Sequence, residues 1–221
     1  MGLQIKSGSA AMKVKGVADV VFCFDCTGSM SSVIENVKTN VNKFVEGLNA
    51  DQNIKIDWLM RAVGYGDLEC GEEVQNGNKF VGDVAEFQSQ VSNIKMVEGG
   101  DTPESTLDAI IYAAKTSKWR DRSQKVIVVF TDAPTKNVHS STRTKFAINN
   151  VDELKKDLTE NHIKLFLWGY TDDQYKALQV VPKSEITLMP DPHSTLVSAD
   201  MVKVLEIMGK TISSEMKSDV L

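Results

Sequence analysis

The chain has 221 residues and a formal net charge of −5, with 42% hydrophobic and 25% charged residues. This length suits one α/β domain better than two small ones, and the composition is that of an ordinary folded globular protein. Because there is no long basic run, charge gives no reason to expect nucleic acid or an anionic membrane as a partner. The longest apolar stretch is too short to cross a bilayer.

The first residues and the cysteines bear on the cellular compartment. Residues 1–16 contain neither the apolar core nor the cleavage pattern of a signal peptide, and we expect them to be a lead-in segment. Cys23, Cys26 and Cys70 are an odd number of cysteines, from which no secreted-type disulfide framework can be built. We therefore expect a cytoplasmic protein with one domain over residues 17–213 and a C-terminal tail over residues 214–221.

The predicted strands are short apolar segments. Two of them, 18–24 and 126–130, are apolar without alternation, which is typical of parallel strands buried on both faces, and each is followed within two residues by an aspartate. Phe80 and Val81 are expected to form an antiparallel edge hairpin with an earlier strand. The strand candidates in chain order are residues 18–24, 54–63, 126–130, 163–169 and 186–189.

Between the strands, apolar residues recur at helical spacing. Pro103 is well placed near the start of one of these segments, because proline is tolerated in the first helical turn. The alternation of strands and helices predicts a doubly wound, mainly parallel sheet with helices on both faces. The predicted helices are residues 31–49, 107–114, 151–158 and 202–212.

Oxygen-bearing side chains follow the first strand directly. Asp25 ends the strand, and Thr27 and Ser29 place hydroxyl groups two and four residues further on. We expect Gly28 to let this loop turn sharply. In open α/β sheets, ligands bind at the carboxyl ends of the strands where the winding direction reverses, which is where this loop should lie.

Two further loops offer oxygen atoms at the same edge of the sheet. Counting the hairpin, the fourth strand ends at Thr131 and Asp132, and a glycine-rich loop before the helix at 107–114 contains Thr102. Two acids neighbour Thr102. We interpret Asp101 as a solvated loop residue and Glu104 as a partner of the helix dipole, with a contact to a metal-bound water as the alternative.

These three loops together resemble the von Willebrand factor A domains, a family that includes the integrin I domains. The family's metal-ion-dependent adhesion site combines D-x-S-x-S after the first strand, a threonine before a middle helix and an aspartate after the fourth strand. The match departs from this pattern in having Thr27 for the first serine, which preserves the hydroxyl. The resemblance covers roughly residues 17–212 and implies these metal ligands: Asp25, Thr27, Ser29, Thr102 and Asp132.

The segment D-C-T-G-S-M, together with Val63-Gly-Tyr-Gly-Asp67, is most similar to the branch of this family found beside α-type kinases and in bacterial cytosolic relatives. An all-oxygen ligand set suits a hard cation and favours Mg²⁺ or Mn²⁺ over Ca²⁺ or zinc. The resemblance implies that the ion binds an Asp or Glu of a partner protein. It also implies a non-enzymatic binding module that assembles with a kinase, phosphatase or AAA-type ATPase component, and not with nucleic acid or a membrane.

Other interpretations of the same residues remain open. Asp25 and Thr27 could cap the following helix. Asp25 could instead be the nucleophile of a Mg²⁺-dependent phosphohydrolase of the haloacid dehalogenase type, for which Asp172 and Asp173 would be late acidic ligands. That mechanism gives no role to the loop containing Thr102, and we favour the binding module.

Three features outside the main motif also carry hypotheses. The acidic loop at 67–73 could hold a second cation, although such loops are more often solvated. Cys23 and Cys26 have a redox spacing, but Cys23 lies inside a predicted strand, so we interpret Cys23 as a packing residue and Cys26 as the unconstrained position of the metal loop. An apolar stripe on the helix at 202–212 can dock in more than one register, and we expect this helix to be coupled to the metal loops.

Overall fold

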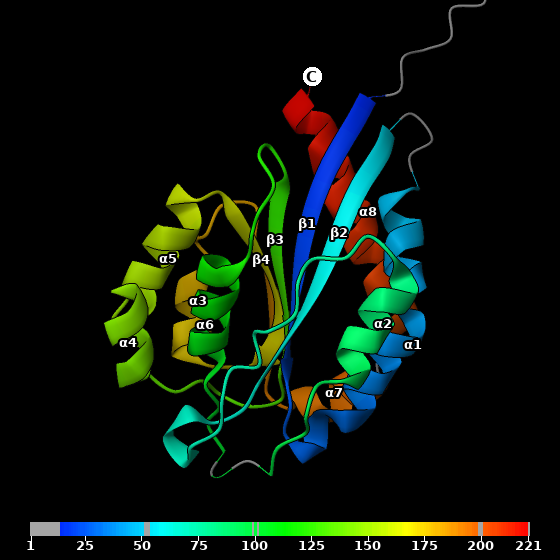
Figure 1. Ribbon diagram of the computed structural model, residues 1–221. Helices are drawn as coiled ribbons and strands as arrows, with labels where there is room; N and C mark the ends of the chain where they lie inside the picture. Colours follow the sequence, from blue (N-terminus) through cyan, green and yellow to red (C-terminus); the bar gives the residue numbers. More distant parts are fainter. Residues whose placement is uncertain (1–13, 51–53, 99, 101, 199–200, 221) are drawn as a thin grey trace, which may run out of the picture.

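The structure is a computed structural model that describes residues 14–50, 54–98, 100, 102–198 and 201–220. Five parallel strands form one sheet in the order β2-β1-β3-β4-β5 (Figure 1). Because β2 and β3 lie on opposite sides of β1, the winding direction reverses there and opens a ligand position at the carboxyl ends of β1 and β3. The strands are β1 (Val14–Asp25), β2 (Ile54–Tyr65), β3 (Gln124–Phe130), β4 (Ile163–Tyr170) and β5 (Glu185–Met189).

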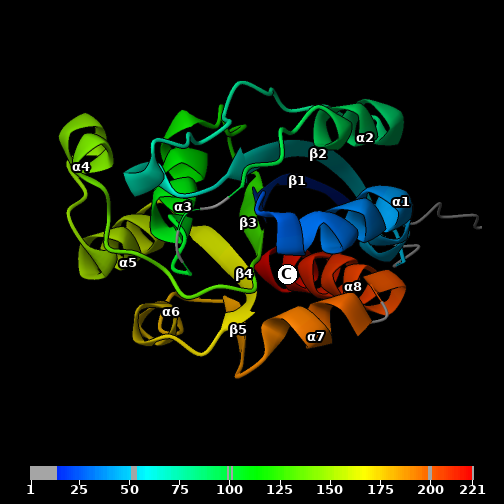
Figure 2. The ribbon, with the colours of Figure 1, turned by 90° about the horizontal axis from the view of Figure 1, so that it is seen from below.

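Helices cover both faces of this sheet, as the alternation of elements predicted (Figures 1 and 2). One face carries α1 (Ser31–Leu48), α2 (Val84–Ser92), α7 (Pro192–Ser198) and α8 (Met201–Val220). The other carries α3 (Thr106–Thr116), α4 (Ser140–Phe146), α5 (Val151–Glu160) and α6 (Asp173–Leu178). Two short 3₁₀ turns, η1 (Gly28–Met30) and η2 (Leu68–Cys70), follow β1 and β2. None of the described helices is long and apolar enough to cross a membrane.

The inner strand β1 is buried on both faces, which explains its apolar run without alternation. Val20 and Phe22 belong to the hydrophobic cluster under α1 and α8, whereas Val21 and Cys23 belong to the cluster under α3 and α5. All four side chains are fully buried. A strand with helices on both sides has no solvent face, so neither set of alternating positions needs to be polar.

The expected antiparallel edge hairpin is not a strand of the sheet. Val81 exchanges two backbone hydrogen bonds of 2.8 Å with Met60, but this contact is an isolated bridge. Beside it, side chains satisfy the edge of β2: Asn78 Nδ2 donates to the Ala62 carbonyl at 3.0 Å, and the Ala62 amide donates to Gln90 Oε1 at 3.0 Å. Because side-chain amides serve these backbone groups, a continuous backbone ladder does not form.

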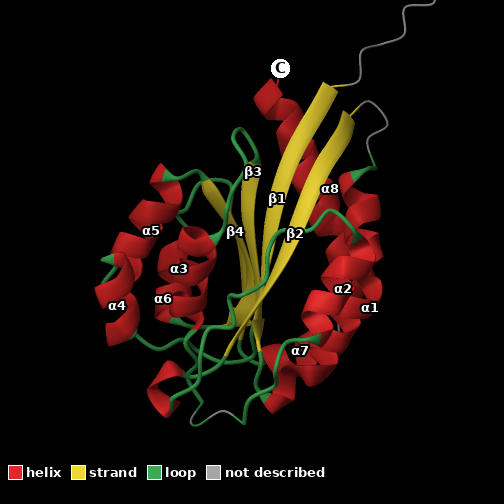
Figure 3. Cartoon of the chain, in the orientation of Figure 1, coloured by secondary structure: helices red, strands yellow, loops and turns green. Residues whose placement is uncertain are grey.

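The described residues overlap the two expected terminal segments in part (Figure 3). Most of the expected lead-in, residues 1–16, lies outside the described residues, and β1 begins at Val14. The expected tail, residues 214–221, continues α8 as far as Val220, because it contains no glycine or proline to end the helix. Helix α2 was not predicted, although Asp83 caps it by accepting from the Glu86 amide at 3.0 Å.

Candidate metal site

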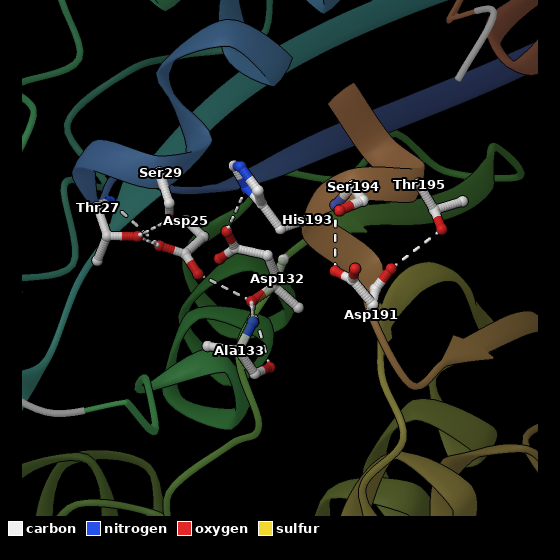
Figure 4. A network of polar contacts seen from close by, with 10 residues as sticks. Asp25, Thr27, Ser29, Asp132, Ala133, Asp191, His193, Ser194 and Thr195 are labelled. Atoms are coloured by element: carbon white, nitrogen blue, oxygen red, sulfur yellow. Dashed lines mark hydrogen bonds and ion pairs between the residues drawn. The ribbon is translucent and has the colours of Figure 1, made fainter. Parts of the chain in front are cut away.

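Asp25 ends β1, two residues before Thr27, which lines a hollow formed by three loops. Figure 4 shows the Asp25 side chain beside those of Thr27, Ser29 and Asp132. The Asp25 side chain is fully buried, and both carboxylate oxygens accept hydrogen bonds. Oδ1 accepts from the Thr27 hydroxyl at 2.7 Å and the Thr27 amide at 3.1 Å, and Oδ2 accepts from the Thr131 hydroxyl at 2.8 Å. Burial raises the pKa of Asp25 to about 6, against the lowering effect of the hydrogen bonds from Thr27 and Thr131.

The hydroxyl groups of the first loop form a chain that leads from Asp25 toward solvent. Thr27 Oγ1 lies 3.4 Å from Ser29 Oγ, and Ser29 is exposed. The Thr27 side chain makes no capping hydrogen bond to η1, and neither does Met30 to α1, so helix capping does not account for this loop. Gly28 has no positive φ, and a Cβ there would meet no described atom within 4 Å. The backbone at this turn therefore does not require glycine, contrary to the expectation for Gly28.

The other two loops complete the hollow, whose volume is about 500 Å³. Thr102 is exposed and Asp132 half-buried, and both face the same space as Thr27 and Ser29. Four of the five predicted ligands thus line the hollow, whereas the fifth, Asp25, is fully buried and accepts a hydrogen bond from Thr27. The lining residues of the hollow are Thr27, Gly28, Ser29, Glu98, Gly100, Thr102, Glu104, Asp132 and Ala133.

Glu104 lines this hollow, where contact with a metal-bound water was the alternative expectation for it. Its residue is only 3% exposed, and Oε2 has no hydrogen-bond partner among the described residues. Burial raises the pKa of Glu104 to about 8, and the nearby carboxylates of Asp25, Asp67 and Glu72 raise it further while Lys136 lowers it. Helix α3 begins at Thr106 and has Asp108 as its first-turn acid, so Glu104 precedes the helix rather than serving its dipole. In the sequence, Glu104 can be recognised as the acidic residue directly after Pro103.

The backbone around Glu104 joins the second and third loops. The Glu104 amide donates to the Pro134 carbonyl at 3.0 Å, and the Lys136 amide donates to the Glu104 carbonyl at 2.8 Å. The Tyr175 hydroxyl of α6 lies within hydrogen-bonding distance of two groups, Thr106 Oγ1 at 2.8 Å and the Ala133 carbonyl oxygen at 3.2 Å. These contacts hold the loops at a defined separation.

The acidic loop after β2 is neutralised by a lysine. Lys136 Nζ lies 2.7 Å from Asp67 Oδ2 and 3.1 Å from Glu69 Oε2, and the Asp67 side chain is fully buried. Burial alone would raise the pKa of Asp67, but hydrogen bonds from Cys70, Lys136 and the Glu69 amide lower it below its usual value. The ammonium group therefore supplies the positive charge that a second cation in this loop would bring.

Two other sequence hypotheses can be judged from the structure. Cys23 and Cys26 are both buried, and burial raises the pKa of each thiol to about 12, so neither is a reactive thiolate at neutral pH. Asp172 caps α6 by accepting from the Gln174 and Tyr175 amides at 2.8 and 3.2 Å. Oδ1 of Asp172 is thus the acceptor that caps the start of α6.

The residues of the hollow fit a hard divalent cation. The described residues include no group of three or more His, Cys, Asp or Glu side chains arranged for a metal, so hydroxyl groups must supply part of any ligand set. Hydroxyl and carboxylate oxygens are the donors that Mg²⁺ and Mn²⁺ prefer. The unpartnered oxygen of Glu104 is a further observation in favour of a cation, since a buried carboxylate oxygen without a donor is costly.

A doubly wound parallel sheet with such a hollow at its switch point defines a class of α/β ligand-binding domains. Within that class, the sequence model of the von Willebrand factor A domain matches residues 19–159. The match covers more than half of the chain, which therefore belongs to the von Willebrand factor A domain family.

Individual relatives agree with this membership. Alpha-protein kinase vwkA of Dictyostelium discoideum is 30% identical over 131 residues, which are 59% of this chain and 21% of that kinase. The chain thus spans about a fifth of this relative's length. This similarity agrees with the expected likeness to the branch found beside α-type kinases.

Solved structures with the same fold include a von Willebrand factor type A protein from Catenulispora acidiphila. It has a TM-score of 0.57 and 14% identity, and the match covers 90% of this chain and 43% of that one. Another is proximal thread matrix protein 1 from the mussel byssus, with a zinc-occupied metal-ion-dependent adhesion site. It has a TM-score of 0.58 and 15% identity, with 88% of this chain and 45% of that one covered. At these identities the likeness shows the fold alone.

Proposed function

We propose that this domain is a metal-dependent protein-binding module. A Mg²⁺ or Mn²⁺ ion held by the three loops binds an Asp or Glu side chain of a partner protein. The observation that carries the proposal is the meeting of hydroxyl and carboxylate groups from three separate loops in one open hollow. The proposed ligands are Asp25, Thr27, Ser29, Thr102 and Asp132.

The chemistry of the hollow supports a role in binding an acidic group. A divalent ion with few anionic ligands keeps part of its positive charge, which attracts a carboxylate from outside the protein. The exposed positions of Ser29 and Thr102 leave the hollow accessible to a side chain on another molecule. The Glu104 carboxylate offers a further oxygen donor at the same place.

The same geometry supports a function without catalysis. Both oxygens of Asp25 are held by Thr27 and Thr131 donors, whereas a phosphoryl-transfer nucleophile needs an oxygen directed at the substrate. We propose that the module assembles a complex inside the cell, in which a kinase, phosphatase or AAA-type ATPase component takes part. The similarity to an α-protein kinase motivates the first of these partner classes.

Metal binding is tested by calorimetric titration of EDTA-treated protein with Mg²⁺ and with Mn²⁺. The wild type should show one site, and Asp25→Ala should abolish it. Asp121→Ala is the matched control, because Asp121 is exposed and lies outside the hollow. Binding by Asp25→Ala with the wild-type affinity would refute the assignment of this site.

Partner binding is tested by capturing proteins from a cell extract in the presence of Mg²⁺ or of EDTA. A true partner should be retained by the wild type with Mg²⁺ and lost both with EDTA and with Asp132→Ala. Its binding should then disappear when one surface Asp or Glu of the partner is replaced by Asn or Gln. A partner retained equally in EDTA would contradict the metal-dependent mode.

A further inference from the structure

A histidine from α7 contacts one of the proposed metal ligands. His193 Nδ1 lies 3.0 Å from Asp132 Oδ2, although the two residues are 61 positions apart in the sequence. In Figure 4 the Asp132 carboxylate lies between the His193 ring and the group formed by Asp25, Thr27 and Ser29. The tertiary structure therefore brings a residue of a fourth segment, α7, into contact with Asp132, which lines the hollow.

The chemistry of this contact sets the direction of the hydrogen bond. A carboxylate oxygen is an acceptor, so the imidazole must donate from Nδ1. Among the described residues, no other group donates to the Asp132 side chain. One carboxylate oxygen, Oδ2, is thus held by His193, and the other, Oδ1, stays available for an ion in the hollow.

The short helix α7 presents this imidazole in a defined position. The Ser194 amide donates to Asp191 Oδ1 at 3.2 Å, and the Thr195 hydroxyl donates to the Asp191 carbonyl at 3.0 Å. Leu196, on the inner side of α7, is only 2% exposed and packs into the main hydrophobic cluster. The first turn of α7 is therefore anchored at its start and on its inner side, while half of the His193 side chain remains exposed.

We propose that His193 is a positioning residue of the metal site. By holding Oδ2 of Asp132, it restricts the rotation of that carboxylate and keeps Oδ1 turned toward the ion, so less conformational entropy is lost when the ion binds. This inference rests on the proposed function, because it assumes that Asp132 is a metal ligand. His193 lies outside the sequence motifs of the three loops that line the hollow.

The test compares metal affinities of EDTA-treated variants by calorimetry. His193→Ala should bind Mg²⁺ and Mn²⁺ about tenfold more weakly than the wild type, the lower end of what loss of such a supporting hydrogen bond usually costs. His193→Asn should keep most of the affinity, because its amide nitrogen is attached to Cγ as Nδ1 is. Val197→Ala, a change at an exposed position of the same helix, should have no effect.

A second comparison separates positioning from direct ligation by the imidazole. Co²⁺ accepts imidazole readily, whereas Mg²⁺ strongly prefers oxygen. If His193 acts through Asp132, His193→Ala should weaken the affinities for Co²⁺ and for Mg²⁺ by the same factor. A much larger loss of affinity for Co²⁺ than for Mg²⁺ would overturn the proposal and show that the His193 imidazole binds the ion directly.

Stability measurements and the affinities of the variants distinguish the remaining explanations. Unfolding midpoints in EDTA should be the same for all these variants, since His193 is half-exposed. Wild-type affinity in His193→Ala, or a loss in His193→Asn as large as in His193→Ala, would overturn the positioning role and leave the metal site standing. Failure of the wild type itself to bind any of these ions would instead refute the proposed function.

Discussion

Gly47 of α1 and Gly209 of α8 bring the two helices into backbone contact. A Cβ on Gly47 would lie 2.3 Å from the Glu206 carbonyl oxygen, and a Cβ on Gly209 would lie 2.3 Å from the Phe44 carbonyl oxygen. If α8 moved along its axis by one turn, Leu205 or Ser213 would replace Gly209 at this crossing, and their side chains have no space there. The contact therefore opposes the sliding of the C-terminal helix that its apolar stripe suggested.

Gly209→Ala should destabilise the protein by about 2 kcal/mol or more, because the added methyl group forces two closely packed backbones apart. The higher helix propensity of alanine offsets only part of this cost. Urea unfolding monitored by circular dichroism measures the change, with Gly77→Ala as a control at a site where a Cβ meets no described atom within 4 Å. Equal stability of Gly209→Ala and the wild type would show that α8 can shift to accommodate the methyl group.

The raised pKa of Asp25 predicts how stability depends on pH when no metal is bound. A carboxyl group with a higher pKa in the folded chain than in the unfolded chain binds its proton more tightly when folded. The folded state therefore loses stability as the pH rises from the usual value of 3.8 to about 6, by about 3 kcal/mol for this group. Glu104, whose pKa is raised to about 8, extends the loss to higher pH.

Asp25→Asn removes the contribution of this carboxyl, so in EDTA the variant should gain stability relative to the wild type between pH 4 and pH 7. Millimolar Mg²⁺ should stabilise the wild type at pH 7 and have little effect at pH 4, where Asp25 is protonated. Urea titrations at a series of pH values, with and without Mg²⁺, test both statements. A wild type and variant with parallel pH profiles would contradict them.

The ion pair between Lys136 and Asp67 should be strongly coupled, since the Asp67 side chain is fully buried and that of Lys136 is 9% exposed. Lys136→Met leaves a buried carboxylate without its cation and should cost about 3–5 kcal/mol at pH 7. Adding Asp67→Asn removes that charge and should restore much of the lost stability. A double-mutant cycle measures this coupling between the two residues. Additive effects of the two changes would mean that the pair contributes little.

Because the pKa of Asp67 is lowered, its contribution has the opposite pH dependence to that of Asp25. It is present above the ordinary pKa of an aspartate and is lost as the pH falls through the lowered value. The cost of Lys136→Met should therefore shrink in acid, where Asp67 is protonated. If Lys136→Met instead destabilised the protein equally from pH 2 to pH 7, the loss would come from the packing of the lysine side chain and not from its charge.

No phosphatase activity is expected from this domain. Both oxygens of Asp25 already accept hydrogen bonds from Thr27 and Thr131, and Oδ1 of Asp172 caps α6. Incubation of the Mg²⁺-loaded protein with a generic phosphate monoester should release phosphate no faster than the Asp25→Asn variant does. Steady turnover that disappears in Asp25→Asn would favour the hydrolase mechanism over the binding module.

Local sequence patterns were sufficient for the framework of this domain. The apolar runs predicted the inner strands β1 and β3, because a strand covered by helices on both faces must be apolar at successive positions. The residues after these strands predicted the place of the hollow, since parallel strands bring their carboxyl ends to one edge. Spacing within a single loop was enough to predict that the side chains of Asp25, Thr27 and Ser29 lie close together.

The tertiary structure decided which distant groups surround that loop. The edge of β2 was predicted to pair as a hairpin, but side-chain amides of Asn78 and Gln90 occupy its backbone groups. His193 contacts Asp132 only because α7 packs back across the sheet, and Lys136 neutralises Asp67 only because two loops after different strands meet. Periodicity and motif spacing describe neighbours along one segment, whereas these contacts depend on how separate segments pack, which is a property of the whole chain.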